Sequence, residues 1–211
     1  CLKQDYKKKQ IIFFDDKSTD GSLKKVKKFK EQNDLDFTNL SNSKKIKTYP
    51  TFNHINAIKR SLSKANGEYI FLLDSDDYFH KNKISEIIKI FLKDKKIKLV
   101  MDQPILKYQK KTIKKNFIYK PSKNKWPKFP PTSCMCFEKK TFQKVLKKVC
   151  FKKYPNLAID FRLALYYSLI LEKFYVHKSH LTFYRQVEES MDSKYIKYRS
   201  KAWWKRRDEA F

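Results

Sequence analysis

Glycine is nearly absent from this chain, which has only 2 glycines among 211 residues. Glycine adopts positive φ at little cost, so a chain this poor in it keeps glycine where a turn or a close backbone approach requires it. Gly21 closes the polar run that starts at Asp15, and Gly67 precedes an apolar run, Tyr69 to Leu73, that ends in acidic residues. These two segments are therefore the first places to look for function.

Long apolar runs and metal-type cysteine spacings are also lacking. No run reaches the roughly 20 residues of a membrane-spanning helix, and no signal-peptide pattern opens the sequence. Cys134 and Cys136 are separated by one residue, one short of the usual zinc pair, and the other two cysteines and the four histidines are scattered. We therefore expect reduced thiols and a cytoplasmic location, with peripheral association at the inner membrane face as a further option.

Arginine is scarce although the net charge is +28: 44 of the 50 basic residues are lysine. Recognition of bases and phosphates favours the planar arginine fork, so no specific nucleic acid is expected. Lysine is spread along the chain but is absent from residues 65–80. A solvated lysine surface is the favoured interpretation. Attraction to an anionic substrate or to acidic lipid headgroups stays open, as does a non-enzymatic basic module that binds nucleic acid or an acidic membrane.

Hydrophobic residues make up 41% of the chain, which argues for a folded protein. Apolar strand-like runs alternate with amphipathic helical patterns, which predicts an α/β fold with a mostly parallel central sheet flanked by helices. We expect strands at 11–14, 36–40, 69–73, 97–101 and 174–176, and helices at 22–29, 55–65, 82–91, 142–149, 157–171 and around Trp203 and Trp204. Residues 1–9 are expected to end a helix, 107–128 to form an insertion or mobile loop, and the proline-rich 127–134 to be irregular.

Three carboxylates follow the strand expected at 69–73, at Asp74, Asp76 and Asp77. Ligands of open α/β sheets bind at the carboxyl ends of strands. Cations that carry phosphates take one or two carboxylates together with phosphate oxygens. This segment therefore indicates a seat for a metal–diphosphate group, although a polar turn that caps the next helix would have the same composition.

Several motifs now occur in a recognisable order. The segment Asp15-Asp16-Lys17-Ser18-Thr19-Asp20-Gly21-Ser22 is similar to the Asp-Asp-Gly-Ser-Thr-Asp signature of family-2 glycosyltransferases. Asn56, the run Ala65-Asn66-Gly67-Glu68-Tyr69-Ile70 and the run Asp74-Ser75-Asp76-Asp77 resemble the family's next block, which ends in its Asp-x-Asp motif. Ser133, Asp160 in Ala158-Ile159-Asp160-Phe161-Arg162, and Tyr184-Arg185-Gln186 resemble later landmarks, so the likeness covers nearly all of the chain.

The resemblance implies a GT-A fold and one glycosyltransferase domain, residues 1–211, with a nucleotide-sugar half (1–103), an acceptor half (104–190) and a C-terminal helix (191–211). Asp76 and Asp77 would hold Mg²⁺ or Mn²⁺ against the diphosphate. Asp160 would be the general base of an inverting displacement, with a helix cap or a pair with Arg162 as its structural alternatives. The resemblance also implies substrate-binding residues. Asp15 or Asp16 would contact the nucleobase, Asp74 would lie near the ribose, and Arg185 would bind the phosphates. Ser18, Asn56 and Ser133 would be further substrate-binding residues.

The implied donor is a nucleotide-diphosphate sugar, with a UDP-sugar expected first, and the implied acceptor is a glycan or lipid-linked hydroxyl of a bacterial surface polysaccharide. The sequence departs from the family at Lys17, which replaces a glycine, and at Ile159, which replaces a glutamate. The family's opening strand would precede Cys1, so the first strand of the sheet is expected to be missing and the chain to be marginal in folding and activity. A nucleotidyltransferase with the same metal–diphosphate chemistry is the alternative enzyme, although no glycine-rich phosphate loop is visible.

Overall fold

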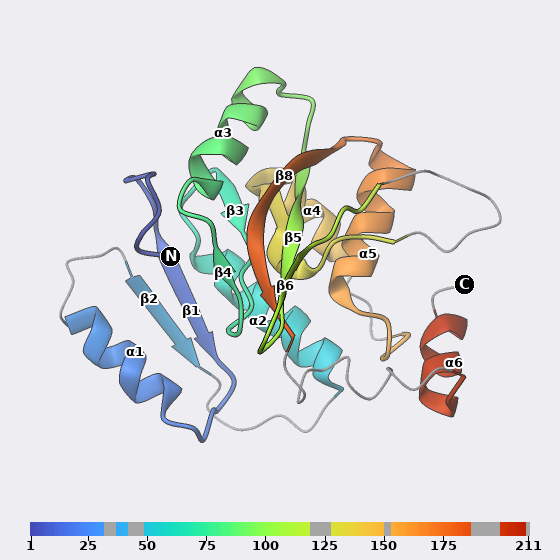
Figure 1. The fold of residues 1–211 in the computed structure, drawn as a ribbon, viewed down its shortest axis with the longest axis horizontal. Coiled ribbons are helices and arrows are strands. Elements are labelled where there is room, and N and C mark those ends of the chain that lie inside the picture. The colour runs from blue at the N-terminus through green and yellow to red at the C-terminus, as the bar shows by residue number, and fades with distance from the viewer. Residues whose placement is uncertain (32–36, 42–48, 119–127, 150–152, 187–198, 210–211) are drawn as a thin grey trace. The chain divides into compact units, whose positions relative to one another are not determined.

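The computed structural model describes residues 1–31, 37–41, 49–118, 128–149, 153–186 and 199–209 (Figure 1). The chain divides into two compact units, one of residues 7–67 and one of residues 1–6 and 68–211. Parts of the predicted loop at 107–128, all of 187–198 in the predicted acceptor half and C-terminal helix, and Cys150 lie outside the described residues.

The unit of residues 7–67 contains a two-stranded parallel sheet with two helices. Strand β1 pairs with β2 from Ile11 opposite Phe37 to Asp15 opposite Ser41. The longer helix, Pro50–Lys64, buries Ile55, Ile58 and Leu62, which are spaced by three and four residues and so lie on one face. The predicted strands and helices of this unit are confirmed, with bounds β1 (Ile11–Asp15), α1 (Ser22–Glu31), β2 (Phe37–Ser41) and α2 (Pro50–Lys64).

The larger unit is built on a mixed sheet with the strand order β3-β7-β5-β8-β4, and β6 pairs with β5. Its strands are β3 (Tyr69–Phe71), β4 (Tyr78–Phe79), β5 (Leu99–Lys107), β6 (Thr112–Lys114), β7 (Met135–Glu138) and β8 (Phe174–Arg185). Its helices are α3 (Lys83–Lys93), the short 3-10 turn Thr132–Cys134, α4 (Lys139–Val149), α5 (Ile159–Leu165), the π-helical turn Tyr166–Leu171, and α6 (Lys201–Asp208).

The prediction of an α/β fold is confirmed, whereas the sheet is mixed rather than mostly parallel. Strand β7 lies between β3 and β5 and is antiparallel to both, so β3 and β5 run in the same direction without pairing. Of the strand pairs in this unit's described residues, β5 with β8 is parallel and the others are antiparallel. The strand β7 was not predicted, because the prolines just before it favoured an irregular segment.

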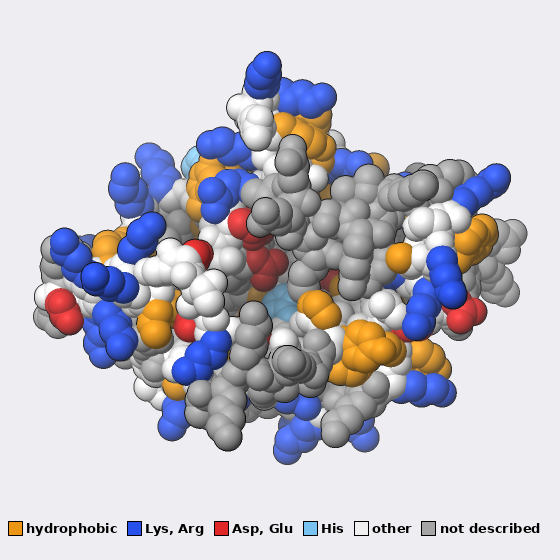
Figure 2. Space-filling view, turned by 90° about the horizontal axis from the view of Figure 1, so that it is seen from below, with side chains coloured by type: hydrophobic (Ala, Val, Ile, Leu, Met, Phe, Trp, Pro, Cys, Tyr) orange, Lys and Arg blue, Asp and Glu red, His pale blue; other side chains and the backbone are white. Residues whose placement is uncertain are grey.

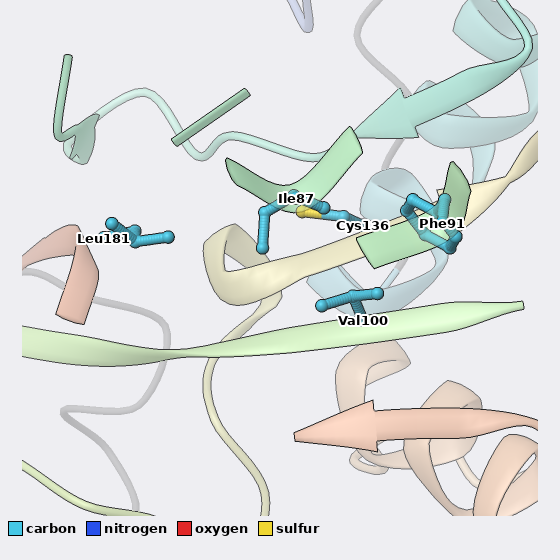
Figure 3. Packing of buried hydrophobic residues seen from close by; sticks show 5 residues of the cluster. All are labelled: Ile87, Phe91, Val100, Cys136 and Leu181. Atoms are coloured by element: carbon cyan, nitrogen blue, oxygen red, sulfur yellow. The ribbon is translucent and has the colours of Figure 1, made fainter. Parts of the chain in front are cut away.

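The two faces of this sheet are covered by different helices. Ile87 and Phe91 of α3 pack on Val100, Cys136 and Leu181, which come from β5, β7 and β8 (Figure 3). The next residue of β7, Phe137, points to the opposite face, because side chains alternate along a strand. There it stacks on Phe142 of α4.

Residues 1–6 do not form the predicted helix end. The Gln4 side chain donates to the carbonyl of His80 (2.8 Å) and accepts from the amide of Ile84 (3.2 Å). The amide of Asp5 donates to the carbonyl of Lys81 (2.9 Å). The polar groups of this segment are thus satisfied by the loop between β4 and α3, and no local helix is needed to satisfy them.

Within the described residues, no helix is both long and apolar enough to cross a lipid bilayer.

Candidate functional site

Residues 74–77, here called the carboxylate turn, follow β3 where the sequence predicted a metal–diphosphate seat. The amide of Asp77 donates to the carbonyl of Asp74 (3.1 Å) and closes the turn. The amide of Asp74 donates to the hydroxyl of Ser133 (3.0 Å), which anchors the turn to the residues before β7. Asp74 and Asp76 are half-buried, whereas Asp77 is only 8% exposed.

The carboxylate of Asp77 is only partly satisfied. Its Oδ1 accepts a hydrogen bond from the amide of Arg185 (2.9 Å), while its buried Oδ2 has no hydrogen-bond partner among the described residues. Burial raises the pKa of Asp77 to about 6; hydrogen bonds from Ser133 and Arg185 oppose the rise, and the charges of Asp76 and Asp74 add to it. A buried carboxylate oxygen with no hydrogen-bond donor is uncommon in native proteins, and such an oxygen is a suitable ligand for a divalent cation.

Arg185, at the end of β8, lies against the same turn. Its Nε donates to the carbonyl of Asp76. The contact follows from the sheet, because β4 continues directly from the turn and pairs with β8, Tyr78 opposite Phe183. The structure therefore brings together five predicted site residues: Asp74, Asp76, Asp77, Ser133 and Arg185.

Ser133 was predicted to bind substrate, but its side chain is fully buried. It contacts the carboxylate turn within the protein interior, through the amide of Asp74.

Asp160, the candidate base, lies in the first turn of α5 and is half-buried. Its Oδ1 accepts a hydrogen bond from the amide of Phe161 (2.7 Å). The guanidinium of Arg162 donates to the carbonyls of Leu157, Val149, Lys153 and Tyr154. Arg162 thus ties the end of α4 and the following loop to α5.

The other predicted residues lie in the unit of residues 7–67. The buried carboxylate of Asp15 accepts from the amides of Lys17 (3.1 Å) and Ser18 (3.3 Å), so it holds the turn after β1. Asp16 is half-buried, Ser18 is exposed, and Asn56 lies half-buried on α2. Asp15 thus has the structural role of a turn-capping residue, whichever ligand the segment binds.

Lys17 occupies a left-handed backbone conformation, with φ 61°, where the family signature has glycine. A side chain in this conformation costs about 1 kcal/mol or more. We expect Lys17→Gly to stabilise the protein by about 0.5–1 kcal/mol, after allowance for the added freedom of glycine in the unfolded chain. Urea denaturation would measure the change. Lys27→Gly, on the exposed face of α1, is the matched control and should destabilise by about 1 kcal/mol; equal effects of the two changes would contradict the assignment of strain to Lys17.

Sequence reasoning missed a buried polar network beside the carboxylate turn. Lys83 and Asp102 form an ion pair (Nζ–Oδ1 2.7 Å) with both side chains fully buried. Thr182 of β8 is also fully buried and bonds both partners. A signal was present: Lys83 stands four residues before Ile87 and eight before Phe91, on the apolar stripe of α3, and Asp102 interrupts an apolar strand.

The residues present fit a divalent cation that is held jointly with a diphosphate. Among the described residues, no group of three or more His, Cys, Asp or Glu side chains is arranged as a self-sufficient metal site. A phosphate-bridged Mg²⁺ or Mn²⁺ needs only one or two carboxylates from the protein. The carboxylate turn supplies Asp76 and Asp77 for this purpose, and the unpartnered oxygen of Asp77 is a suitable donor.

The described basic residues are spread over the face seen in Figure 2. Figure 2 shows lysine and arginine side chains distributed around the visible face rather than gathered in one patch. This distribution agrees with a generally solvated lysine surface.

Comparisons with solved structures show the fold. The chain is similar to Staphylococcus aureus TarS 1-349 in complex with UDP, with a TM-score of 0.62 and 16% identity over 92% of this chain and 55% of that one. It is also similar to the mannosyltransferase PcManGT from Pyrobaculum calidifontis, solved with GDP-Man and Mn²⁺, with a TM-score of 0.61 and 14% identity over 92% and 53% of the two chains. The fold matches GT-A glycosyltransferases, as expected.

Curated relatives match over shorter stretches. Poly-beta-1,6-N-acetyl-D-glucosamine synthase of Staphylococcus aureus (strain COL) is 28% identical over 99 residues, which are 47% of this chain and 22% of the relative. An uncharacterized glycosyltransferase of Haemophilus influenzae is 32% identical over 98 residues, 44% of this chain and 35% of the relative. The chain thus spans well under half the length of these relatives. The model of the family named Glycosyl transferase family 2 matches residues 1–163, and the chain belongs to that family.

Proposed function

We propose that the protein transfers a sugar from a nucleotide-diphosphate donor to a hydroxyl acceptor, with a divalent cation and with inversion at the sugar carbon. The observation that carries the proposal is the carboxylate turn, where the unpartnered Oδ2 of Asp77 lies beside Asp76 and the end of β8. Family membership supports the transfer of a sugar. The solved relatives that contain UDP or GDP-Man with Mn²⁺ support a nucleotide-sugar donor, and a UDP-sugar is our first candidate.

In this proposal Asp76 and Asp77 hold Mg²⁺ or Mn²⁺, which when bound would neutralise charge on the departing diphosphate. Asp74 contacts the ribose, and the planar fork of Arg185 binds phosphate oxygens from the adjacent strand end. Asp15 shapes the turn that presents Asp16 and Ser18. The carboxylate of Asp15 or Asp16 accepts a hydrogen bond from the nucleobase of the donor. Asn56 completes the proposed nucleotide contacts.

The acceptor step requires a base. We propose that Asp160 removes the proton of the acceptor hydroxyl as that oxygen attacks the sugar carbon from the face opposite the diphosphate, which gives inversion. The acceptor would be a glycan or lipid-linked hydroxyl in bacterial surface-polysaccharide synthesis. The proposal includes a division of the chain into a donor half (1–103) and an acceptor half (104–190). It also includes a cytoplasmic location, with the charge of +28 attracting the protein to acidic lipid.

The test is a calorimetric titration of UDP with and without Mn²⁺. We expect wild-type protein to bind UDP only when Mn²⁺ is present, and Asp76→Ala to weaken that binding by at least about tenfold, because a carboxylate ligand is lost. Asp94→Ala removes an exposed carboxylate after α3 and is the matched control, expected to bind as wild type does.

Binding of UDP that ignores Mn²⁺ and Asp76→Ala would refute the metal assignment. If UDP, GDP and cytidine nucleotides all failed to bind while DNA bound in a salt-sensitive manner, the enzyme proposal would fail in favour of a basic binding module. Reaction of a nucleoside triphosphate with a sugar phosphate, catalysed by the protein, would instead indicate the nucleotidyltransferase alternative.

A further inference from the structure

The carboxylate turn rests on one buried serine. The Ser133 hydroxyl accepts a hydrogen bond from the amide of Asp74 (3.0 Å), the residue on whose carbonyl the turn closes through the amide of Asp77 (3.1 Å). Ser133 therefore anchors the residue at which the turn begins and closes. It is fully buried, so it supports the turn from the protein interior.

Ser133 is in turn held by a buried cation. Lys83 Nζ donates to the Ser133 carbonyl (2.6 Å) and to Thr182 Oγ1 (2.7 Å), and pairs with Asp102 Oδ1 (2.7 Å). The other oxygen of Asp102 accepts from the Thr182 hydroxyl (2.7 Å) and the Leu181 amide (3.2 Å). The Lys83 ammonium also lies 4.1 Å from the centre of the Phe79 ring.

The buried pair Lys83–Asp102 is not expected to stabilise the core more than apolar side chains would. Desolvation of two charges often outweighs their attraction, and apolar residues of similar volume are frequently as stable or more stable. Burial has the largest influence on the pKa of Lys83 and lowers it, but the charge of Asp102, its hydrogen bond and the neighbouring Cys136 and Cys134 together raise the pKa above its usual value, which favours the charged lysine. The network joins α3, β5, β8 and the 3-10 turn before β7. Of these elements, β8 contacts the carboxylate turn through Arg185 and the 3-10 turn contacts it through Ser133. The geometry of the network suits a role in fixing positions better than a role in stability.

We propose that Lys83 and Asp102, acting with Thr182 through Ser133, are positioning residues that hold the carboxylate turn in the geometry that binds a metal–diphosphate group. The inference rests on the proposed function, since it assigns the network to that same site. Outer-shell partners of metal ligands commonly change metal affinity by about 10–100-fold when they are replaced.

The experiment measures the affinity of Mn²⁺ in the presence of UDP, by electron paramagnetic resonance of free Mn²⁺, for full-chain variants. Ser133→Ala and the apolar double variant Lys83→Met/Asp102→Leu should each weaken binding by about 10–100-fold. Thr182→Val keeps the side-chain shape without the hydroxyl and should weaken binding several-fold, while Thr182→Ser should restore it. Ser168→Ala deletes another buried hydroxyl, on the π-helical turn, and should bind as wild type does.

Amide hydrogen exchange without metal gives an independent measurement. In the double variant the amides of Asp74, Asp77 and Arg185 should exchange faster, while those of β1 and β2 keep their wild-type rates. Wild-type binding together with unchanged variant affinities and exchange rates would overturn the inference and leave the proposed function intact. Failure of wild-type protein itself to bind Mn²⁺ with UDP would refute the proposed function and, with it, the inference.

Discussion

Lys83→Met alone is expected to destabilise the protein by about 3–5 kcal/mol, because it leaves the Asp102 carboxylate buried without its cation. Both side chains are fully buried, so water cannot replace the lost partner without a rearrangement of the core. Guanidinium denaturation followed by tryptophan fluorescence and circular dichroism would measure the loss. The double variant Lys83→Met/Asp102→Leu should lie much closer to the wild type, since neither charge is left unpaired.

The comparison of single and double variants separates the pair's role in stability from its proposed role in positioning. Lys81→Met, two residues earlier on the exposed surface, is the control and should change stability by less than about 0.5 kcal/mol. A single variant as stable as the control would mean that Asp102 is not held by Lys83. A double variant as unstable as the single one would show that the hydrogen bonds, rather than the charge balance, dominate.

Arg162→Met is expected to cost about 3–5 kcal/mol, because the guanidinium donates to four carbonyls and is only 4% exposed. The carbonyl of Val149 is at the end of α4, so the same change also removes a cap from that helix. Arg162→Lys keeps the charge but replaces a planar fork with a single ammonium, and should recover only part of the loss.

Urea denaturation of these two variants and of Lys147→Met would test this expectation. Lys147 is exposed on α4, so its replacement should change the free energy of unfolding by less than about 0.5 kcal/mol. Equal midpoints for Arg162→Met and Lys147→Met would show that the carbonyls find other partners at no cost. A large loss confined to Arg162→Met would identify this side chain as the link that holds α4, the loop and α5 together.

The elements predicted well are those whose burial is one-sided. Helices α2, α3 and α4 bury residues at helical spacing, and that spacing is visible in the sequence. Strand β8 was predicted only at Phe174–Val176, although it extends to Arg185. Its middle begins with four consecutive polar residues, 177–180, which hide the strand pattern. Its length depends on pairing with β5 and β4, which no local window contains.

The part of the candidate site that consists of a strand end followed by carboxylates was predictable from the sequence. The part that depends on contacts between residues far apart in the sequence was less predictable. The nearness of Arg185 to Asp76 and Asp77 follows from the pairing of β4 with β8, over a long sequence separation. The network of Lys83, Asp102 and Thr182 was missed because lysine is almost always a surface residue, and this chain has 44 of them. Lys83, the one fully buried lysine among the described residues, is recognisable only by its place on an apolar stripe.

The parallel pairing of β5 with β8 has a consequence for the order of folding. Leu99 pairs with Phe174, so the sheet cannot close until most of the chain has left the ribosome. Contacts of such long sequence separation pay their loop-closure entropy late and slow folding. Until β8 arrives, Val100, Ile87 and Phe91 lack the cover of Leu181, and apolar surface of this kind favours aggregation of partly folded chains. Mutual repulsion among chains of charge +28 opposes that association, which gives the lysine-rich surface a use before the native structure exists.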